Sequence, residues 1–236
     1  MNVAIITGAS QGLGLATARA LTRRGWAVAI DARREGPLRQ AAAELATGEV
    51  AAGQVASVPG DVTDPGHRAA LVAAARALGP VTLLMNNASA LGPSPQPALA
   101  DYPEAELARV YAVNVLAPLA LTQLVTGDLL AAGGTVINVS SDAAVEPYPG
   151  WGGYGSAKAA LDHLTAIFAA EHPELAVYAL DPGDMRTELH QLAFPGEDIS
   201  DRPEPAASVP AIERLLDERP PSGRYRASRL IPAVAS

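Results

Sequence analysis

The chain has 236 residues, of which 49% are hydrophobic and only 4% aromatic, so we expect one core of closely packed small aliphatic side chains. Its formal net charge of −8 argues against a broad basic surface for nucleic acid, and the absence of cysteine excludes disulfides, thiolate metal sites and thiol nucleophiles. No uninterrupted apolar run is long enough to span a membrane, and no signal peptide is evident. We therefore expect a single domain, residues 1–236, in a soluble cytoplasmic protein with no membrane or nucleic-acid partner.

Short runs rich in valine and isoleucine alternate along the chain with helical patterns. This alternation predicts a single-domain, doubly wound parallel sheet with helices on both faces, a Rossmann-like, three-layer α/β fold. A last short strand is expected within 223–236, and proline-rich stretches at 91–103 and 184–205 predict loops. The strands are predicted at 3–7, 27–31, 54–58, 81–85, 135–139 and 176–180, and the helices at 12–24, 37–46, 65–78, within 104–130 and at 154–170.

A glycine-rich turn, Thr7-Gly8-Ala9-Ser10-Gln11-Gly12-Leu13-Gly14, joins the first predicted strand to the first predicted helix. Glycines let the backbone turn sharply, approach a pyrophosphate and present the N–H groups of the helix start to it. The spacing differs from the commoner G-x-G-x-x-G fingerprint, and an ordinary glycine-rich turn is the alternative interpretation. The position between a first strand and a helix favours a phosphate-binding turn.

Charged and amide side chains follow the next three predicted strands. After the second strand, Asp31 could accept a hydrogen bond from an adenosine ribose and Arg33 could pair with a 2′-phosphate, although a solvated charge cluster is the alternative. After the third strand, Asp61 could accept from an adenine amine or could cap a turn. After the fourth strand, the amides of Asn86 and Asn87 could hold a cofactor or pin neighbouring backbone.

The segment Tyr154-Gly155-Ser156-Ala157-Lys158 carries the strongest chemical signal, because Tyr154 and Lys158 are one helical turn apart and share a face. A free phenol has a pKa near ~10 and a nearby ammonium group lowers it, so we expect Lys158 to tune Tyr154 for proton exchange. Lys158 is also the only lysine among 17 cationic residues. Ser141, after the fifth predicted strand, could orient a substrate oxygen. A surface Tyr/Lys pair beside an ordinary turn serine is the alternative.

These signals share one edge of the predicted sheet, because each follows a strand at its carboxyl end. Ligands of open parallel α/β sheets bind at that edge, so the joint placement favours one site over several unrelated turns. The groups that meet there are the turn at 8–14, Arg33, Asp61, Asn87, Ser141 and Pro182-Gly183.

Together, the motifs resemble the short-chain dehydrogenase/reductase family, from Val3 to about Thr187. The glycine turn looks like the family's TGxxxGxG motif, and Asp61 looks like its adenine-side acid. Asn86-Asn87-Ala88 looks like the NNAG element, and Pro182-Gly183 with Thr187 looks like the PGxxxT motif. The positions of the family's catalytic tetrad fall on Asn114, Ser141, Tyr154 and Lys158.

The resemblance implies an enzyme that transfers a hydride between NAD(P)(H) and a carbonyl or secondary alcohol carbon, with no metal. It implies that Tyr154 donates the proton and Ser141 positions the carbonyl. It also implies that Lys158 holds the nicotinamide ribose and that Asn114 holds a water in a proton relay. The cofactor-binding residues that it implies are Gly8, Ser10, Gln11, Gly12, Leu13, Gly14, Arg33, Asp61, Val62, Asn87, Ala88, Tyr154, Lys158, Pro182, Gly183, Met185 and Thr187.

The cofactor choice depends on the end of the second strand. Counting from Gly25, the position that usually carries the NAD-selecting acid is Ala32, and Arg33 follows where NADP-preferring members often have arginine. NADP(H) is therefore expected, with NAD(H) as the alternative if a small backbone shift brings Asp31 to the ribose.

The chain departs from the family pattern at two places. Ser89 replaces the usual glycine, which we expect to matter little, and the segment 223–226 lacks the usual closing strand sequence. The second departure puts the usual tetramer contacts in doubt, although a homo-oligomer, dimer or tetramer, is still expected.

The small-molecule carbonyl or alcohol substrate is not readable from the sequence. Its expected lining, 90–95, 142–151 and 184–195, mixes acidic, aromatic and apolar side chains, and we expect 184–205 to act as a substrate lid. A non-catalytic NAD(P) sensor or scaffold on the same fold is the alternative, against which the intact tetrad argues. An epimerase or dehydratase is disfavoured, because such relatives usually carry a longer substrate portion.

Overall fold

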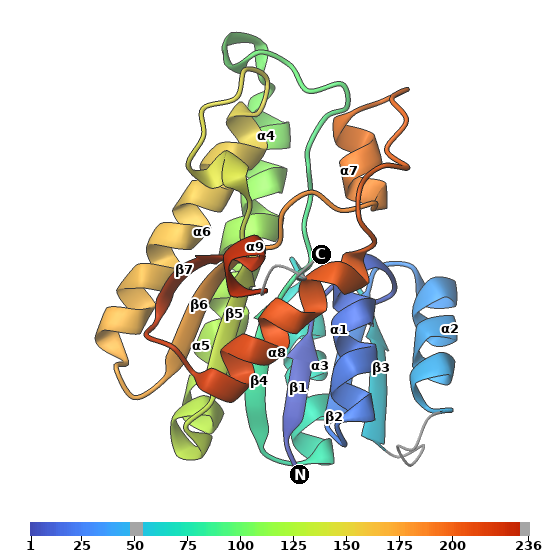
Figure 1. Ribbon diagram of the computed structural model, residues 1–236, viewed down its shortest axis with the longest axis vertical. Coiled ribbons are helices and arrows are strands. Elements are labelled where there is room, and N and C mark those ends of the chain that lie inside the picture. Colours follow the sequence, from blue (N-terminus) through green and yellow to red (C-terminus); the bar gives the residue numbers. More distant parts are fainter. Residues whose placement is uncertain (48–53, 232–236) are drawn as a thin grey trace, which may run out of the picture.

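The computed structural model describes residues 1–47 and 54–231, which form one sheet of 7 strands in the order β3-β2-β1-β4-β5-β6-β7 (Figure 1). All neighbouring strands run parallel, so each connection must return across the sheet. The chain order reverses between β1 and β4, which is where open sheets of this kind bind ligands. The predicted doubly wound, Rossmann-like fold is confirmed. The strands are β1 (Val3–Ile6), β2 (Ala27–Ala32), β3 (Val55–Pro59), β4 (Val81–Asn86), β5 (Thr135–Val139), β6 (Ala176–Asp181) and β7 (Gly223–Arg226).

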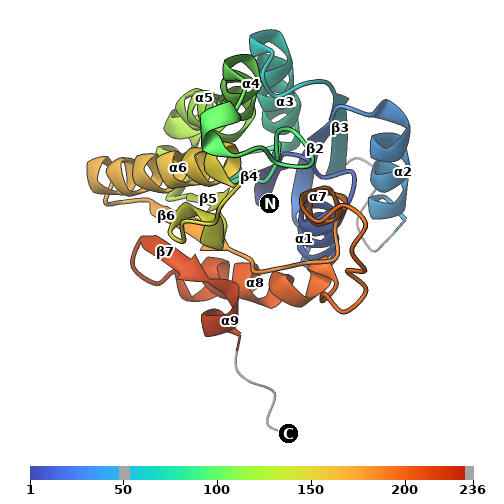
Figure 2. The ribbon, with the colours of Figure 1, turned by 90° about the horizontal axis from the view of Figure 1, so that it is seen from above.

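Helices cover both faces of the sheet (Figure 2). They are α1 (Gly12–Arg23), α2 (Glu35–Leu45), α3 (Pro65–Leu78), α4 (Glu104–Tyr111), α5 (Ala117–Ala132), α6 (Gly152–Glu171), α7 (Glu188–Ala193), α8 (Val209–Glu218) and α9 (Ala227–Leu230). The apolar residues of α1, α2 and α8 pack on one face, and those of α3, α5 and α6 pack on the other. A sheet covered in this way presents only the carboxyl and amino ends of its strands to ligands.

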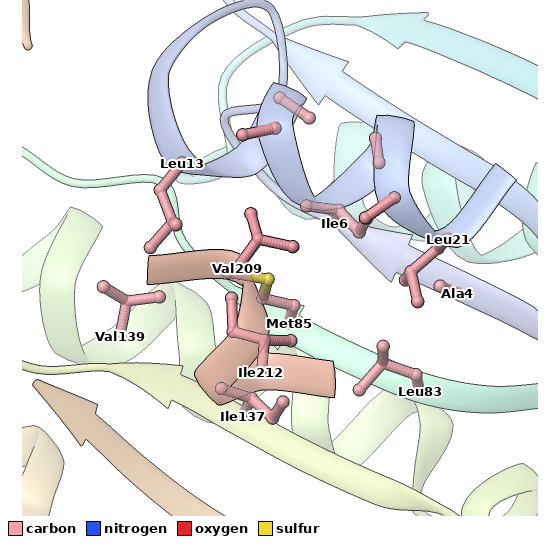
Figure 3. Close-up of a cluster of buried hydrophobic side chains, with 14 of the residues drawn as sticks. Ala4, Ile6, Leu13, Leu21, Leu83, Met85, Ile137, Val139, Val209 and Ile212 are labelled. Carbon is pink, nitrogen blue, oxygen red and sulfur yellow. The ribbon is translucent and has the colours of Figure 1, made fainter. Parts of the chain in front are cut away.

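The core consists of two clusters of buried side chains, one on each face of the sheet, and β1 contributes to both. All of its residues are buried, with Ala4 and Ile6 on the α1 side and the alternate residues on the α3 side. Figure 3 shows Ile6 in the first of these clusters, together with Leu13 of α1 and Ile212 of α8. The small aliphatic side chains expected from the composition therefore fill both layers.

Three helices after α6 were not predicted from the sequence. α7 lies inside the stretch 184–205 that was predicted to be a loop, and Thr187 caps it by accepting a hydrogen bond from the backbone N–H of His190 at 3.2 Å. α8 and α9 were not predicted at all. The last strand, expected within 223–236, is present as β7. Residues 232–236 of that segment lie outside the described residues.

The helix predicted within 104–130 is divided. α4 and α5 are joined by a π-helical turn, Ala112–Leu116, which contains Asn114, and such turns often occur at functional positions. The whole stretch Glu104–Ala132 has the length and apolar composition to cross a membrane, with 39% of its most apolar window buried. Leu121 and Val125 of α5 are buried in the core beneath the sheet, so the composition of this stretch fits a core helix.

Candidate functional site

A cleft of about 1200 Å³ opens at the carboxyl ends of the strands, around the point where the strand order reverses. Its volume exceeds that of a pocket for one drug-sized ligand, so it can hold a large cofactor and a small substrate together. Gly14 and Asn114 are not part of the lining. The other predicted site residues line the cleft: Gly8, Ser10, Gln11, Gly12, Leu13, Arg33, Asp61, Val62, Asn87, Ala88, Ser141, Tyr154, Lys158, Pro182, Gly183, Met185 and Thr187.

The glycine turn has the backbone conformation that only glycine adopts readily. Gly8 and Gly12 have φ angles of +65° and +59°, in the left-handed region. A Cβ on Gly8 would lie 2.9 Å from the Cα of Ala88, so the turn also needs glycine for close packing against the end of β4. No side chain caps the first turn of α1 in the described residues, which leaves its backbone N–H groups to bind an anion from the cleft.

Asn87 holds the glycine turn in place. Its side-chain Nδ2 donates to the carbonyl O of Thr7 at 2.8 Å and of Gly8 at 3.2 Å. The backbone N–H groups of Asn87 and Ala88 donate to Oγ1 of Thr7 at 2.9 and 3.0 Å. A Cβ on Gly14 would lie 2.6 Å from Nδ2 of Asn87. Asn87 therefore pins the backbone of the glycine turn and Gly14 makes room for its side chain, while the cofactor-holding role of Asn87 stays a prediction.

Asp31 is engaged by the protein itself. It is 0% exposed, its Oδ1 accepts a hydrogen bond from the N–H of Gly8 at 2.7 Å, and its Oδ2 lies 2.9 Å from Nε2 of His67. A Cβ on Gly60 would lie 2.2 Å from the ring of His67, so this pair depends on a glycine at that position. The contact of His67 with Asp31 was not predicted, because nothing in the local sequence connects His67 to β2.

The arginines after β2 differ in their surroundings. Arg33 is exposed at the cleft, and no ion pair or hydrogen bond engages its guanidinium within residues 1–47 and 54–231. Arg34 Nη2 instead lies 3.0 Å from Oε2 of Glu188 on α7 and 3.1 Å from Oε1 of Gln11 in the glycine turn. Arg33 is thus the guanidinium available to a ligand phosphate.

Asp61 stabilises a turn, which is one of the two roles that the sequence left open, and its adenine-binding role stays a prediction. Its Oδ1 accepts from the backbone N–H and the hydroxyl of Thr63, at 2.9 and 2.8 Å, and it also lines the cleft. Burial acts to raise the pKa of Asp61, but the hydrogen bonds from Thr63 and the charges of Arg33 and His67 outweigh it and leave that pKa lowered. Asp61 therefore stays ionised and can accept hydrogen bonds near neutral pH.

Tyr154 and Lys158 lie in the first two turns of α6 and are 6% and 2% exposed. Nζ of Lys158 lies 5.5 Å from the centroid of the Tyr154 ring and donates to the carbonyl O of Val139 at 2.8 Å. Burial raises the pKa of Tyr154 to about 12, against smaller effects of the Ser89 and Ser141 hydroxyls, and it lowers the pKa of Lys158 to about 8. The Tyr154 pKa is therefore not the lowered one that the Tyr154/Lys158 spacing led us to expect, because burial disfavours the charged form of the phenol and dominates.

Ser141 starts the short turn that follows β5. Its Oγ donates to Oδ1 of Asp142 at 3.0 Å and accepts from the backbone N–H of Ala143 at 3.2 Å. Oδ2 of the same carboxylate accepts from the Tyr148 hydroxyl at 3.0 Å. The Ser141 hydroxyl is therefore held in a fixed direction beside the phenol of Tyr154, whose pKa it acts to lower.

Asn114 holds the loop after β4. Its Oδ1 accepts from the backbone N–H of Ala90 at 2.9 Å and from the Ser89 hydroxyl at 3.1 Å, while Nδ2 donates to the carbonyl O of Ala90 at 2.8 Å. Protein groups thus occupy both ends of the Asn114 amide, and its expected water-holding role stays a prediction. The Ser89 hydroxyl also acts to lower the pKa of Tyr154, an effect that burial outweighs.

The predicted nicotinamide side lies at the end of β6. Oδ1 of Asp181 accepts from the N–H of Gly183 at 3.0 Å, and Gly183 has a φ of +76°, so the chain turns sharply into the stretch that contains α7. Met185 and Thr187 follow along the cleft wall. Thr187 carries out a second task as the cap of α7, which does not prevent its hydroxyl from lining the cleft.

Aromatic rings line the end of the cleft next to Tyr154. The Trp151 ring lies edge-on to the Tyr154 ring, with centroids 5.8 Å apart, and it lies 5.9 Å from the Phe194 ring beyond α7. The His190 ring packs on Phe194 at 4.8 Å. Trp151 and His190 line this end of the cleft, and Phe194 packs against both of their rings without being part of the lining.

Residues 2–198 match the family model described as short chain dehydrogenase. The chain is 34% identical over 201 residues to sepiapterin reductase of Mus musculus, covering 81% of this chain and 77% of the relative. It is similar to the structure of an alcohol dehydrogenase from the archaeon Thermococcus sibiricus complexed with 5-hydroxy-NADP, with a TM-score of 0.85, 29% identity and coverage of 96% and 95%. It is also similar to a short-chain dehydrogenase from Escherichia coli CFT073 complexed with NADPH, with a TM-score of 0.87, 27% identity and 96% coverage of each chain.

Proposed function

Because the chain belongs to the short-chain dehydrogenase family and is an oxidoreductase of that type, we propose that it interconverts a small-molecule carbonyl and its secondary alcohol, using NADP(H). The observation that carries the proposal is that Ser141, Tyr154 and Lys158 line the same cleft as the glycine turn. Phosphate-binding backbone and proton-transferring side chains therefore face one space, as a reaction between a dinucleotide and a second ligand requires.

The residues present fit such a cofactor. Gly8 and Gly12 leave the turn without side chains, the open N–H groups at the start of α1 would hold the pyrophosphate, and Asp61 would accept from the adenine amine. Lys158 and Thr187 would hold the nicotinamide end. The bound nicotinamide supplies or accepts the hydride.

The side chains of the protein would handle the substrate oxygen and the proton. Ser141 would turn its hydroxyl from Asp142 to the substrate oxygen and so orient the carbonyl. Tyr154, whose pKa is raised to about 12, keeps its proton at neutral pH and would give it to the oxygen as negative charge develops there. The Lys158 ammonium would stabilise the phenolate that remains.

Oxidation of NADPH in the presence of carbonyl compounds tests this proposal. The purified protein is mixed with NADPH and a panel of aldehydes, ketones and dicarbonyls that includes sepiapterin, the substrate in the name of the mouse relative. We expect at least one member to be reduced. Tight NADPH binding without turnover of any member would instead favour the sensor or scaffold alternative.

The preference for NADP(H) rests on the end of β2. Asp31 is fully buried and already accepts from Gly8 and contacts His67, so its carboxylate is not free to bind a ribose hydroxyl. Arg33 is exposed at the cleft, where its guanidinium can pair with a 2′-phosphate. These contacts support NADP(H) over NAD(H).

Arg33→Ala is expected to weaken NADPH binding by ~1.5–3 kcal/mol, the scale of a hydrogen bond to a charged group, and to leave NADH binding nearly unchanged. Dissociation constants for both cofactors, measured by calorimetry, check this. Arg39→Ala on α2 is the matched control, because Arg39 pairs with Glu35 and does not line the cleft. Equal losses for NADPH and NADH in the Arg33 variant would show a structural role.

We also propose that residues 184–205, including α7, form a lid over the cleft. Glu188 of α7 reaches across to the cofactor side, where its Oε2 accepts from Nε2 of Gln11 at 2.6 Å and from Arg34 at 3.0 Å. Ser94 Oγ holds the other end of α7 by donating to the carbonyl O of Leu192 at 2.7 Å. These exposed polar contacts can break and re-form, whereas Leu189 and Ala193 pack α7 on the apolar cluster that includes Tyr154, which would hold the closed position.

Hydrogen exchange of α7 is expected to slow when NADPH and a substrate are added together, because a closed lid protects its backbone. Exchange is measured by mass spectrometry with and without both ligands, and peptides from α5 serve as the internal control. Glu188→Gln should exchange faster than wild type in α7 without ligands, since it weakens the pair with Arg34. Strong protection that is the same in all states would mean a fixed loop.

A homo-oligomer remains our proposal for the assembly. Leu116 and Leu124, from the π turn and α5, are 58% and 41% exposed, and Ile167 of α6 is 41% exposed. Both helices lie on the same side of the sheet (Figure 2), so their apolar side chains offer a surface that a second copy could cover.

A further inference from the structure

Arg224, on β7, joins three parts of the site. Its Nε donates to Oδ2 of Asp162 on α6 at 2.9 Å. Its Nη2 donates to the backbone carbonyl O of Ser141 at 2.8 Å and to Oδ2 of Asp181 at 3.3 Å. One guanidinium thus fixes α6 and the ends of β5 and β6 to each other. It belongs to the segment 223–226, which lacks the usual closing sequence of the family.

Asp162 lies one helical turn beyond Lys158, on the same face of α6. Its side chain is 14% exposed, and no donor in the described part of the chain completes a hydrogen bond to its Oδ1. Burial raises the pKa of Asp162, and this effect exceeds the opposite effects of the Ser140 hydroxyl, Arg224 and Lys158. An acid in such surroundings is held ionised chiefly by its partners, of which Arg224 makes the direct hydrogen bond.

We infer that Asp162 is a positioning residue for the proposed reaction: its carboxylate, held by Arg224, keeps the Lys158 ammonium charged beside Tyr154. This inference rests on the proposed function. Burial lowers the pKa of Lys158 to about 8, and the charge of Asp162 is the effect that opposes it. Without that charge, Lys158 would lose its proton at a lower pH and could no longer stabilise a phenolate near neutrality.

The other ionisable groups around Lys158 are less able to keep its ammonium charged. Tyr154, on the same helix, is neutral near pH 7 because its pKa is raised to about 12. Asp142, after β5, accepts from the hydroxyls of Ser141 and Tyr148. Asp181, at the end of β6, is balanced by Arg226 as well as Arg224, and it accepts from the Gly183 N–H. The carboxylate that shares the helix face of Lys158 is that of Asp162.

The single lysine makes a direct test possible, because selective ¹³C labelling of lysine gives one side-chain signal whose pH dependence reports the pKa of Lys158 in the cofactor-free protein. Asp162→Asn keeps the shape and removes the charge, so we expect that pKa to fall by about one unit, the scale for loss of a nearby opposite charge. Asp162→Glu keeps the charge and should restore most of the shift. Asp128→Asn, which breaks a 2.7 Å pair with Arg76 outside the cleft, should leave the signal unchanged.

Kinetics then separate positioning from a merely structural role. In Asp162→Asn, the alkaline limb of the kcat/KM profile should move to lower pH by the same shift as the NMR pKa, with rates below that limb retained. A structural role would lower kcat/KM at every pH. If the Asn variant does not fold, Asp162→Ser removes the same charge with a smaller side chain.

A Lys158 signal that titrates at the wild-type pH in the Asn or Ser variant would overturn the inference. The NMR titration needs no turnover, so it decides the inference even if the wild-type protein reduces no carbonyl, an outcome that would count against the proposed function alone.

Discussion

Tyr154→Phe is expected to lower kcat at least ~10²-fold, in line with the usual contribution of a general acid, while NADPH affinity is largely kept. The substitution removes only the phenol oxygen that would give its proton to the substrate. The ring stays, so the edge-on contact with Trp151 at 5.8 Å is preserved and the wall of the cleft keeps its shape. Steady-state rates give kcat, and a titration with NADPH gives the cofactor affinity.

Tyr225→Phe is the matched control for this substitution. The Tyr225 hydroxyl donates to the carbonyl O of Pro221 at 2.7 Å, and the residue does not line the main cleft. Its variant should therefore turn over at close to the wild-type rate. Near-normal turnover in Tyr154→Phe would remove Tyr154 from the mechanism.

Lys158→Arg is expected to reduce kcat/KM at least ~10²-fold with the fold intact, because misplacing a catalytic group by about an ångström has an effect of that order. Lys158 is 2% exposed and its compact ammonium donates to Val139 at 2.8 Å, beneath the Tyr154 ring. A planar guanidinium keeps the positive charge but is larger and directs its donors in a fixed fork, so it cannot make the same contacts from the same stem. Steady-state kinetics measure the loss, and circular dichroism with thermal melting confirms folding.

The alternative view is that Lys158→Arg is a conservative substitution, since every other Lys or Arg position in the chain is arginine. Arg39→Lys on the exposed face of α2 makes the reverse exchange outside the cleft and should leave the kinetics unchanged. Wild-type kcat/KM in a folded Lys158→Arg protein would contradict the role given to Lys158 and the weight given to its being the only lysine.

The strands of the sheet could be predicted because each one is marked by the residues of its own short segment. Each strand is a short apolar run, and parallel strands buried on both faces read as continuous runs such as Val3–Ile6. α8 was harder, because Pro210 near its start is typical of both a helix start and a loop and it follows a proline-punctuated stretch. α7 is a short helix inside that stretch, and its cap, Thr187, was recognised only as part of the motif expected at the cofactor.

The site was predictable where a motif lies within a few residues, as in the glycine turn and the Tyr154/Lys158 pair. Contacts between distant segments were not readable. His67 reaches Asp31 from α3, and Arg224 reaches Asp162 and Ser141 from the last strand. Neither contact has a local pattern, because folding alone brings these residues together.

The pKa of Tyr154 also depends on contacts that the sequence does not show. Sequence spacing showed a cation one turn away and so predicted a lowered pKa, but it could not show that both groups are buried. Burial dominates and raises the pKa of Tyr154 to about 12. The phenol is therefore protonated near neutral pH, which is the form in which it would donate a proton to a substrate oxygen.

Transfer of a labelled hydride tests the central claim most directly. NADPH that carries deuterium at the transferring carbon of the nicotinamide is incubated with wild-type protein and a carbonyl compound, and the product is analysed by mass spectrometry and NMR. We predict an alcohol with deuterium on its carbinol carbon, formed at least ~10²-fold more slowly by Tyr154→Phe. Failure to form any labelled alcohol from the whole carbonyl panel, or equal label transfer by the two proteins, would contradict the account.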